Sequence, residues 1–347
     1  FLFAEKGKSC TKKKEAPKRG FVVFMKGTEE LLKSRPGSIV PLYETMPFSG
    51  NACDFFAKIS DYGRKKNCVL LESADVVTKY GEKSIGSAEP CLKARGKGER
   101  FEVIALSETG GKFLKEIAHS LDFCSGLKIT ADKISGSIKI DKGTVSESER
   151  LKRKTHADVL RAIAFRLKPA YKPFVMYGGL IGAIGYDFID NFEELPKNRK
   201  DVLKEPDYEM NFYDNLFIVE HKKNEISFVC NALIFSEKDM ESEEKRCTEV
   251  IDGYRKMLDA TAPKPKPHKK KKISISSDTP KKEFVAMVER LKKHVLIGDV
   301  FQVVPSRTMI AAYSAEPLDI YNALRELNPS PYMFYFNNSS GILLGSS

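Results

Sequence analysis

Apolar residues recur along the chain in two periods, one typical of helices and one typical of strands. Apolar positions three or four residues apart predict helices. These are a helix that begins after Ser49 or Asn51, and further helices in 110–123, 155–167, 236–258, 280–297 and 316–328. Alternating or continuous short apolar runs predict strands. These lie in 67–75, 99–107, 174–196 and 301–313, with hairpins in 214–235 and 331–347.

Turn and capping residues place the ends of several elements. Thr279 is suited to cap a helix with Pro280 at its first position, and Gly298 is suited to end it. Asn328 and Pro329 close the next helix. Strands follow strands directly and do not alternate one-for-one with helices. This order predicts an α+β fold with antiparallel sheet and not a doubly wound fold.

Positive charge is concentrated in two segments. The net charge is +11. Residues 1–36 hold ten Lys/Arg and four Asp/Glu, and residues 261–280 hold six Lys and one Asp, so these segments account for all of it. We interpret them as a basic, disordered tail and a Pro/Lys-rich linker, and expect no nucleic-acid partner. No apolar run approaches the roughly 20 residues of a membrane span, so no membrane partner is expected.

The composition shifts divide the chain into four parts. They are the tail (1–36), an N-terminal region (37–259), the linker (260–280) and the start of a second region (281–347). The seven cysteines show no C-x-x-C spacing, which favours a reducing, cytoplasmic compartment. None of the five histidines stands at metal-ligand spacing, so each is expected to be structural or solvated. They are His119, His156, His221, His268 and His294.

Two short motifs invite a functional interpretation. The segment 177–187, YGGLIGAIGYD, lacks the G-K-[ST] of a P-loop, so its glycines are expected to mark a bulge or a close backbone approach. The segment 70–75, LLESAD, places a carboxylate and a hydroxyl at a strand end, with Lys83 ten residues after Ser73. Either this is a surface ion pair, or it is a site for a zwitterion. The residues alone favour the ion pair.

Several ordered motifs together resemble anthranilate synthase component I, a family of chorismate-utilising enzymes. They are GDVFQVVPSR, NPSPYMFYF, the final GSS, CVLLESAD, YGGLIGAIGYDFIDNFEELP and EPDYEMNFYDNLFIVEHKKNEI. The resemblance covers roughly residues 38–347 and is weaker near 125–155 and 235–280. It implies two large antiparallel sheets with helices packed outside.

The resemblance also implies a lyase reaction in tryptophan biosynthesis. Ammonia from a glutaminase subunit (anthranilate synthase component II) adds at C2 of chorismate, the C4 hydroxyl leaves, and pyruvate is eliminated to give anthranilate. Magnesium is the implied cofactor, because it holds the chorismate carboxylate. Relatives that add water at C2 carry a lysine where this chain has Gln302. Ammonia needs no strong base, so Gln302 favours amination. Pro305 and Arg307 belong to the same motif and suggest no chemical role of their own.

An inhibitory tryptophan site is the second implication of the resemblance. The family binds tryptophan between the LLES strand and the NPSPYM segment, and Lys83 is the least securely aligned position. The matching residues are Glu72, Ser73, Lys83, Pro331, Tyr332 and Met333. Pro, Tyr and Met offer an apolar, polarizable surface for an indole ring. Glu72 and Ser73 suit the polar groups of the amino acid.

The chain is expected to be a fragment. It begins with Phe1, and the family's magnesium-binding glutamates, catalytic histidine and remaining chorismate ligands align beyond Ser347. We therefore expect no metal site in this chain and no catalysis by it alone. Two alternatives stay open. One is aminodeoxychorismate synthase component I of the folate pathway, which aminates at C4. The other is a non-catalytic module that binds tryptophan or a partner subunit.

Overall fold

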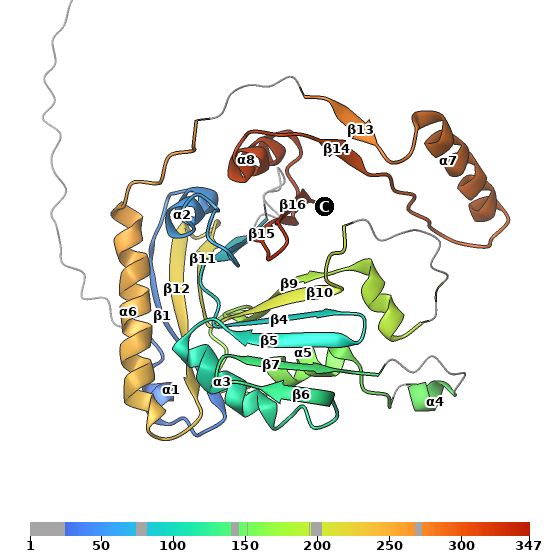
Figure 1. Cartoon of the computed structure of the whole chain (residues 1–347). Helices are drawn as coiled ribbons and strands as arrows, with labels where there is room; N and C mark the ends of the chain where they lie inside the picture. The colour runs from blue at the N-terminus through green and yellow to red at the C-terminus, as the bar shows by residue number, and fades with distance from the viewer. Residues whose placement is uncertain are drawn as a thin grey trace, which may run out of the picture.

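Two large β-sheets form the centre of the molecule in the computed structural model (Figure 1). The structure describes residues 25–73, 82–139, 146–150, 152–193, 195, 203–267 and 273–347. Among these residues one sheet has eight strands, a second has six, and a separate pair has two. Helices pack on the outside of both large sheets. The predicted α+β class with antiparallel sheets is therefore confirmed.

The eight-stranded sheet joins the two ends of the described chain. Its order is β16-β15-β2-β3-β11-β12-β1-β8. The strands are β1 (Ser38–Pro47), β2 (Val69–Glu72), β3 (Lys83–Ser87), β8 (Lys168–Pro169), β11 (Asn215–Glu220), β12 (Glu225–Ile234), β15 (Met333–Asn337) and β16 (Ile342–Ser346). All neighbours are antiparallel except β1 and β8. The hairpins predicted in 214–235 and 331–347 are the pairs β11–β12 and β15–β16, so both predictions are confirmed.

The six-stranded sheet is antiparallel throughout. Its order is β6-β7-β5-β4-β10-β9, with β4 (Leu92–Lys97), β5 (Arg100–Ala105), β6 (Ser125–Ile129), β7 (Lys133–Ser137), β9 (Gly179–Ile184) and β10 (Tyr208–Tyr213). Strand β9 is the glycine-rich segment. A Cβ on Gly182 would lie 2.1 Å from the carbonyl oxygen of Glu209, so β10 approaches the β9 backbone at a distance that only glycine permits. The predicted close approach is confirmed.

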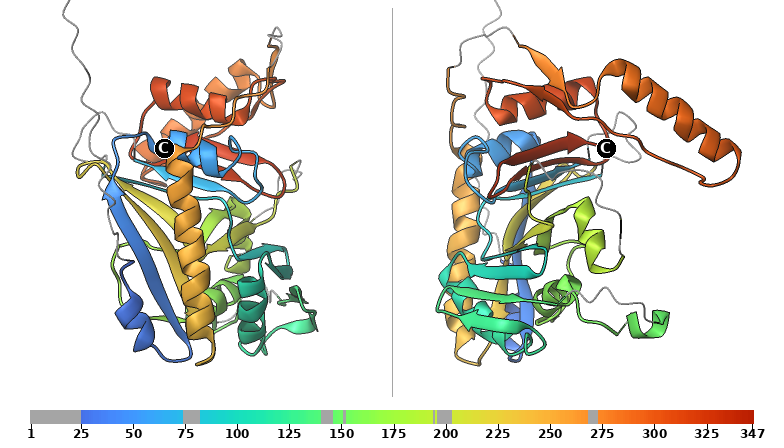
Figure 2. Two further views of the ribbon diagram at one scale, coloured as in Figure 1. Left: turned by 90° about the vertical axis from the view of Figure 1, so that its left-hand side faces the viewer. Right: turned by 45° about the vertical axis from the view of Figure 1, so that its right-hand side comes forward.

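Each sheet is covered by its own helices, as the two views in Figure 2 show. Helices α1 (Thr28–Leu32), α2 (Ala52–Ile59), α6 (Asp239–Asp259) and α8 (Pro317–Leu327) share one apolar core with the eight-stranded sheet. Helices α3 (Glu108–Ala118) and α5 (His156–Ala164) pack on the six-stranded sheet. A short helix, α4 (Glu147–Arg150), and a 3-10 helix (Tyr186–Asn191) lie at the periphery.

Side-chain caps fix the starts of three helices. Asn51 Oδ1 accepts a hydrogen bond of 2.8 Å from the Cys53 backbone N–H, which resolves the choice between Ser49 and Asn51. Ser107 caps α3, and Thr155 forms a capping box with Asp158 at α5. Such caps satisfy N–H groups that have no partner inside the helix.

A projecting arm contains β13 (Ile275–Ser277), α7 (Lys281–Leu296) and β14 (Met309–Ala311) (Figure 1). The sequence predicts a strand over 301–313, but only 309–311 form one, as β14. Within the described part of the chain, β14 pairs only with the three-residue β13, and residues 301–308 have no strand beside them. Thr279 does not cap α7; Pro280 occupies that position without a side-chain bond. Gly298 has a φ of 86° just after the helix and ends it as predicted.

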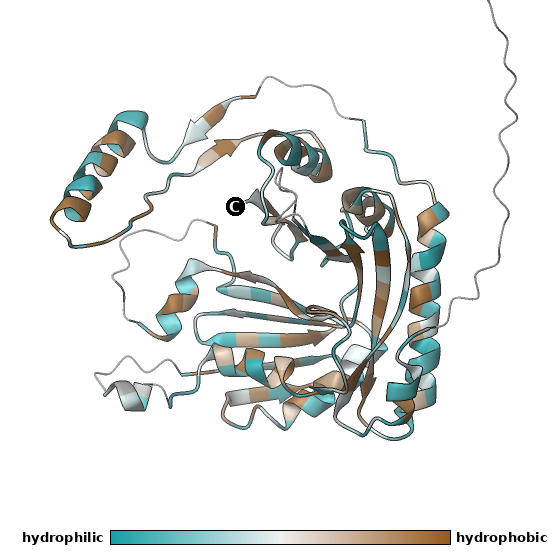
Figure 3. Ribbon diagram, turned by 180° about the vertical axis from the view of Figure 1, so that it is seen from behind, coloured by the Kyte–Doolittle hydropathy of each residue, from teal (hydrophilic) through white to brown (hydrophobic). Residues whose placement is uncertain are grey.

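The apolar side chains of the arm are exposed to solvent. No residue of α7 is buried, and brown stripes mark its apolar residues in Figure 3. Phe301, Val304 and Leu296 are almost wholly exposed. Helical periodicity in this segment therefore predicts the helix but not a contact for its apolar face.

The predicted disordered tail, residues 1–36, is too long. Residues 25–36 are described and include helix α1, whose Leu31 is buried in the core. Lys26 forms a bridge with Tyr43 of β1. The expectation of disorder is thus wrong for 25–36, because Leu31 and Met25 pack on the core of the eight-stranded sheet. Residues 1–24 and the linker segment 268–272, with His268, lie outside the described residues.

No described helix combines the length and the apolar character needed to cross a membrane.

Candidate functional site

The six predicted effector residues gather at one end of three neighbouring strands. Glu72 ends β2 and lies opposite Met333 of β15 on one side and Ser84 of β3 on the other. The Ser73 N–H donates to the Lys83 carbonyl at 3.3 Å. Pro331 and Tyr332 directly precede β15. Sheet pairing therefore brings together residues from both ends of the described chain.

Glu72 is a buried carboxylate with two partners on α8. Its Oε2 accepts a hydrogen bond of 2.7 Å from Tyr321 Oη and lies 3.4 Å from Arg325 Nε. Burial raises the pKa of Glu72, and the Arg325 charge and the Tyr321 hydrogen bond oppose that rise. An ammonium group at this carboxylate would therefore have to share it with Arg325.

The remaining effector residues differ widely in exposure. Met333 is 2% exposed and belongs to the core, whereas Tyr332 is 73% exposed. Lys83 Nζ forms a 3.0 Å ion pair with Glu220 Oε1 of β11. The surface ion pair that the residues alone favoured at the LLESAD strand end is therefore wrong, because Glu72 is buried against Arg325 and Lys83 pairs with Glu220. Tyr332 is thus at the surface and Met333 beneath it in the core.

Sequence reasoning missed Tyr321 and Arg325. They lie four positions apart on one face of α8, and this spacing is visible in the sequence. The same helix contributes Leu318 to the core. Only the fold shows that this face meets the end of β2.

The described histidines have structural contacts. His221 Nε2 lies 2.8 Å from Ser84 Oγ, and His156 Nδ1 lies 3.2 Å from Tyr208 Oη. Burial lowers the pKa of both imidazoles. His294, in the last turn of α7, pairs with Asp299. His119 follows the last residue of α3.

The motif around Gln302 lies in the arm. Gln302 is exposed and stands outside any strand. Arg307 stacks its guanidinium over the Phe284 ring of α7, 5.1 Å from the centroid. Pro305 has no contact that suggests a role in chemistry.

The magnesium implied by the resemblance finds no suitable ligands in the described part of the chain. Among those residues, no three His, Cys, Asp or Glu side chains come close enough to hold a metal ion. Magnesium requires oxygen ligands in near-octahedral geometry. The described residues therefore do not fit this cofactor.

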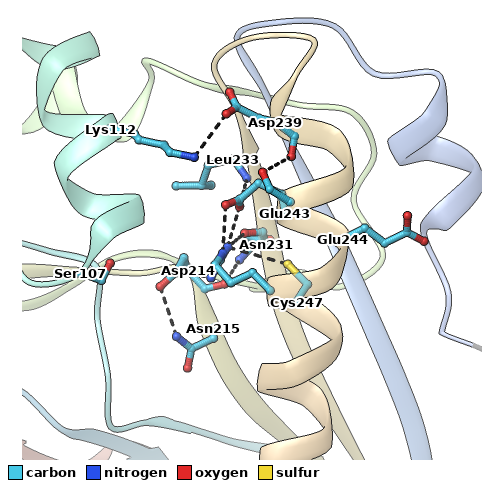
Figure 4. Close-up of polar contacts among 12 residues, drawn as sticks. Ser107, Lys112, Asp214, Asn215, Asn231, Leu233, Asp239, Glu243, Glu244 and Cys247 are labelled. Atoms are coloured by element: carbon cyan, nitrogen blue, oxygen red, sulfur yellow. Dashed lines mark hydrogen bonds and ion pairs between the residues drawn. The ribbon is translucent and has the colours of Figure 1, made fainter.

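A second polar cluster is structural. Arg246 of α6 binds Asp214, Asn231 and Glu243, and these three partners are labelled in Figure 4. Arg246 donates to Asp214 Oδ2 at 2.7 Å, to the Asn231 carbonyl at 2.7 Å and to Glu243 Oε2 at 2.8 Å. Glu243 in turn accepts from the Leu233 N–H. Every charge in this cluster has an opposite partner, so it fastens α6 to β12.

Comparisons with known proteins agree with the motifs. The profile of the family described as chorismate binding enzyme matches residues 118–347. Anthranilate synthase component 1 of Buchnera aphidicola subsp. Pemphigus spyrothecae is 28% identical over 289 residues, which is 82% of this chain and 53% of that protein. The Vibrio cholerae serotype O1 protein of the same name is 27% identical over 308 residues, 88% of this chain and 57% of that protein.

A solved structure is also similar. Anthranilate synthase component I from Streptococcus pneumoniae matches with a TM-score of 0.46 and 21% identity, over 77% of this chain and 50% of that chain. The chain spans about half the length of the curated relatives it matches. Since the family profile matches well over half of its residues, this chain belongs to the chorismate binding enzyme family.

Proposed function

We propose that this chain is part of an anthranilate synthase component I. The observation that carries the proposal is its similarity, over more than four fifths of its length, to curated proteins of that name. The reaction would add ammonia at C2 of chorismate and release water and pyruvate. Its ammonia would come from a glutaminase subunit. The catalytic groups would be supplied by residues that align beyond Ser347.

Gln302 supports amination over hydration. A general base is needed to activate water, and a neutral amide is a poor base. Neutral ammonia is already a nucleophile and needs no such base. The resemblance aligns Gln302 with the lysine of water-adding relatives, so this side chain favours ammonia as the nucleophile.

The alternative amination at C4, by an aminodeoxychorismate synthase, is distinguished genetically. A polypeptide that continues past Ser347 to the length of the relatives is expressed in a bacterial strain that lacks anthranilate synthase component I. Growth without tryptophan is the expected result. In a strain that lacks aminodeoxychorismate synthase component I, we expect no growth without p-aminobenzoate. The reverse pair of results would overturn the proposal.

Tryptophan inhibition is the second part of the proposal. The clustering of Glu72, Ser73, Tyr332 and Met333 at one strand end supports a shared ligand site. The indole would pack on Tyr332 and Met333. The polar groups would meet Ser73 and, together with Arg325, the Glu72 carboxylate. Inhibition would act as a coupling between this site and a distinct catalytic site.

A further inference from the structure

An open recess lies on the polar face of the six-stranded sheet, away from the effector residues. Its volume is about 870 Å³, which is within the range of roughly 300–1,000 Å³ typical of small-molecule sites. Strands β4, β5 and β7 form its floor. Lys204 and Pro206 before β10, and Ser339 and Ser340 of the β15–β16 turn, contribute to its rim. The recess therefore lies where the two sheets meet.

Strand register aligns one row of polar side chains across the floor. Arg95 of β4 lies opposite Glu102 of β5, Glu102 opposite Ser135 of β7, and Ser135 opposite Lys128 of β6. Directly paired residues point to the same face of a sheet. On the other side, Arg95 lies opposite Glu209 of β10, which closes the row at the edge of the recess.

A second row runs parallel to the first. Lys97 of β4 lies opposite Arg100 of β5, and Arg100 lies opposite Ser137 of β7. Arg100 and Lys97 are exposed, and all three residues line the recess. The two rows together place cations and serine hydroxyls on one surface.

The carboxylates of the recess already have partners. Glu102 forms ion pairs with Arg95 and with Lys133. Burial raises the pKa of Glu102, but these two cations lower it by more, and the net effect holds the pKa below its usual range. Glu209 Oε1 accepts from the Ser339 N–H at 2.8 Å and lies 3.5 Å from Lys93 Nζ. Glu102 is therefore engaged with Arg95 and Lys133, and Glu209 is 2% exposed and holds its contacts to Ser339 and Lys93 below the surface of the recess.

Two cations of the recess have no such partner. Within the described part of the chain, neither the Arg100 guanidinium nor the Lys128 ammonium forms a hydrogen bond or ion pair. Both side chains are exposed. Arg246 differs in this respect, because two carboxylates bind its guanidinium. The net charge of the folded region does not reveal this local excess of positive charge. The excess depends on which residues the strand register brings together.

We propose that this recess binds a small, multiply charged anion with an oxyanion group at each end. Arg100 would bind one group through paired N–H donors, and Lys128 would bind the other as a point charge. The two residues are two strands apart and two residues out of line along the strands, so their backbones lie roughly 12 Å apart, a distance that a ligand with two anionic ends and two long side chains can bridge. Ser135 would donate its hydroxyl hydrogen to the same oxygens, whereas the Ser137 hydroxyl already donates to the Ser125 carbonyl at 3.3 Å. Dicarboxylates and phosphorylated metabolites share this chemistry. The proposal does not depend on anthranilate formation.

Isothermal titration calorimetry tests the site directly. Succinate represents dicarboxylates and inorganic pyrophosphate represents phosphorylated ligands, each titrated at low ionic strength into the chain. We expect one equivalent of at least one of them to bind, and the tighter ligand identifies the source. Arg100→Gln and Lys128→Gln should each weaken binding at least tenfold. Arg100→Lys should recover part of the affinity.

Arg290→Gln is the matched control. It removes the same charge as Arg100→Gln, but Arg290 is exposed on α7 and lies outside the recess. Its affinity should stay within a factor of two of wild type. Acetate at matched ionic strength should give no saturable heat. Circular dichroism of each variant verifies its fold. The proposal is overturned if neither succinate nor pyrophosphate binds, or if Arg290→Gln weakens binding as much as Arg100→Gln does.

Discussion

Tyr321 Oη donates a 2.7 Å hydrogen bond to Glu72 Oε2 across 249 positions of the chain. The bond joins α8 to the end of β2. Both groups are buried, and Arg325 lies 3.4 Å from the same carboxylate oxygen. The contact holds the candidate effector site together, because β2 and β15 meet at this end of the sheet.

Replacing Tyr321 by Phe should destabilise the protein. The change leaves the buried Glu72 without its hydroxyl donor, and such a loss costs about 1–3 kcal/mol. The free energy of unfolding is measured by urea denaturation. Tyr313→Phe is the control, because Tyr313 is 65% exposed and should lose less than about 0.5 kcal/mol. Equal stability of Tyr321→Phe and wild type would show that the bond contributes nothing.

Two glycines should respond in opposite ways to replacement by alanine. Gly182→Ala should cost about 3 kcal/mol or more, because the new Cβ would lie 2.1 Å from the Glu209 carbonyl oxygen and backbone would have to move. Gly253→Ala, in the middle of α6, meets no atom within 4 Å and should gain about 0.5–1 kcal/mol. Thermal unfolding compares the two. A stable Gly182→Ala variant would contradict the close β9–β10 approach.

Buried His156 should make the protein less stable below neutral pH. Burial lowers its pKa below 6.5, so between its folded value and 6.5 the unfolded chain binds more protons than the folded one. The contribution of neutral His156 to the free energy of unfolding is therefore complete above pH 6.5 and is lost as the pH falls below 6.5. The melting temperature of wild type should fall more between pH 7.5 and 5.5 than that of His156→Phe. His221, whose pKa burial also lowers, should add to this slope. A His156→Phe profile as steep as that of wild type would contradict the assignment.

Ser73→Ala tests the tryptophan site in a polypeptide that continues past Ser347 and is active. A hydrogen bond to a charged group is worth about 1.5–3 kcal/mol. The tryptophan concentration for half-inhibition should therefore rise at least about tenfold, a factor that corresponds to 1.4 kcal/mol. Activity without tryptophan should stay near wild type. Met333→Ala should show a weaker form of the same effect, while inhibition curves for Ser73→Ala that overlay wild type would refute the site.

The sequence predicts most of the fold because local signals decide it. Alternating apolar positions and turn residues specify the β11–β12 and β15–β16 hairpins, and Asn51 specifies a helix start. The segment 301–313 shows where such signals fail. Its apolar residues suit a strand, but a strand also needs a neighbour, and only 309–311 have one among the described residues.

The sequence predicts only part of the candidate effector site, because local motifs identify some of its residues and long-range pairing supplies the others. Family motifs identify Glu72 and Met333, and the register confirms that they are neighbours. The partners Tyr321 and Arg325, and the cationic rows on the six-stranded sheet, depend on long-range pairing. Charge counted along the chain conceals Arg100 and Lys128, because they are 28 positions apart and only the pairing of β5, β6 and β7 brings them to one face.

The product formed from chorismate tests the central claim most directly. A polypeptide extended past Ser347 to the length of the relatives is incubated with chorismate, ammonium and magnesium, and the products are separated by chromatography with fluorescence detection. The account predicts anthranilate and pyruvate in equal amounts, and no anthranilate from the 347-residue chain alone. Accumulation of aminodeoxychorismate, or anthranilate formed by the 347-residue chain, would contradict it.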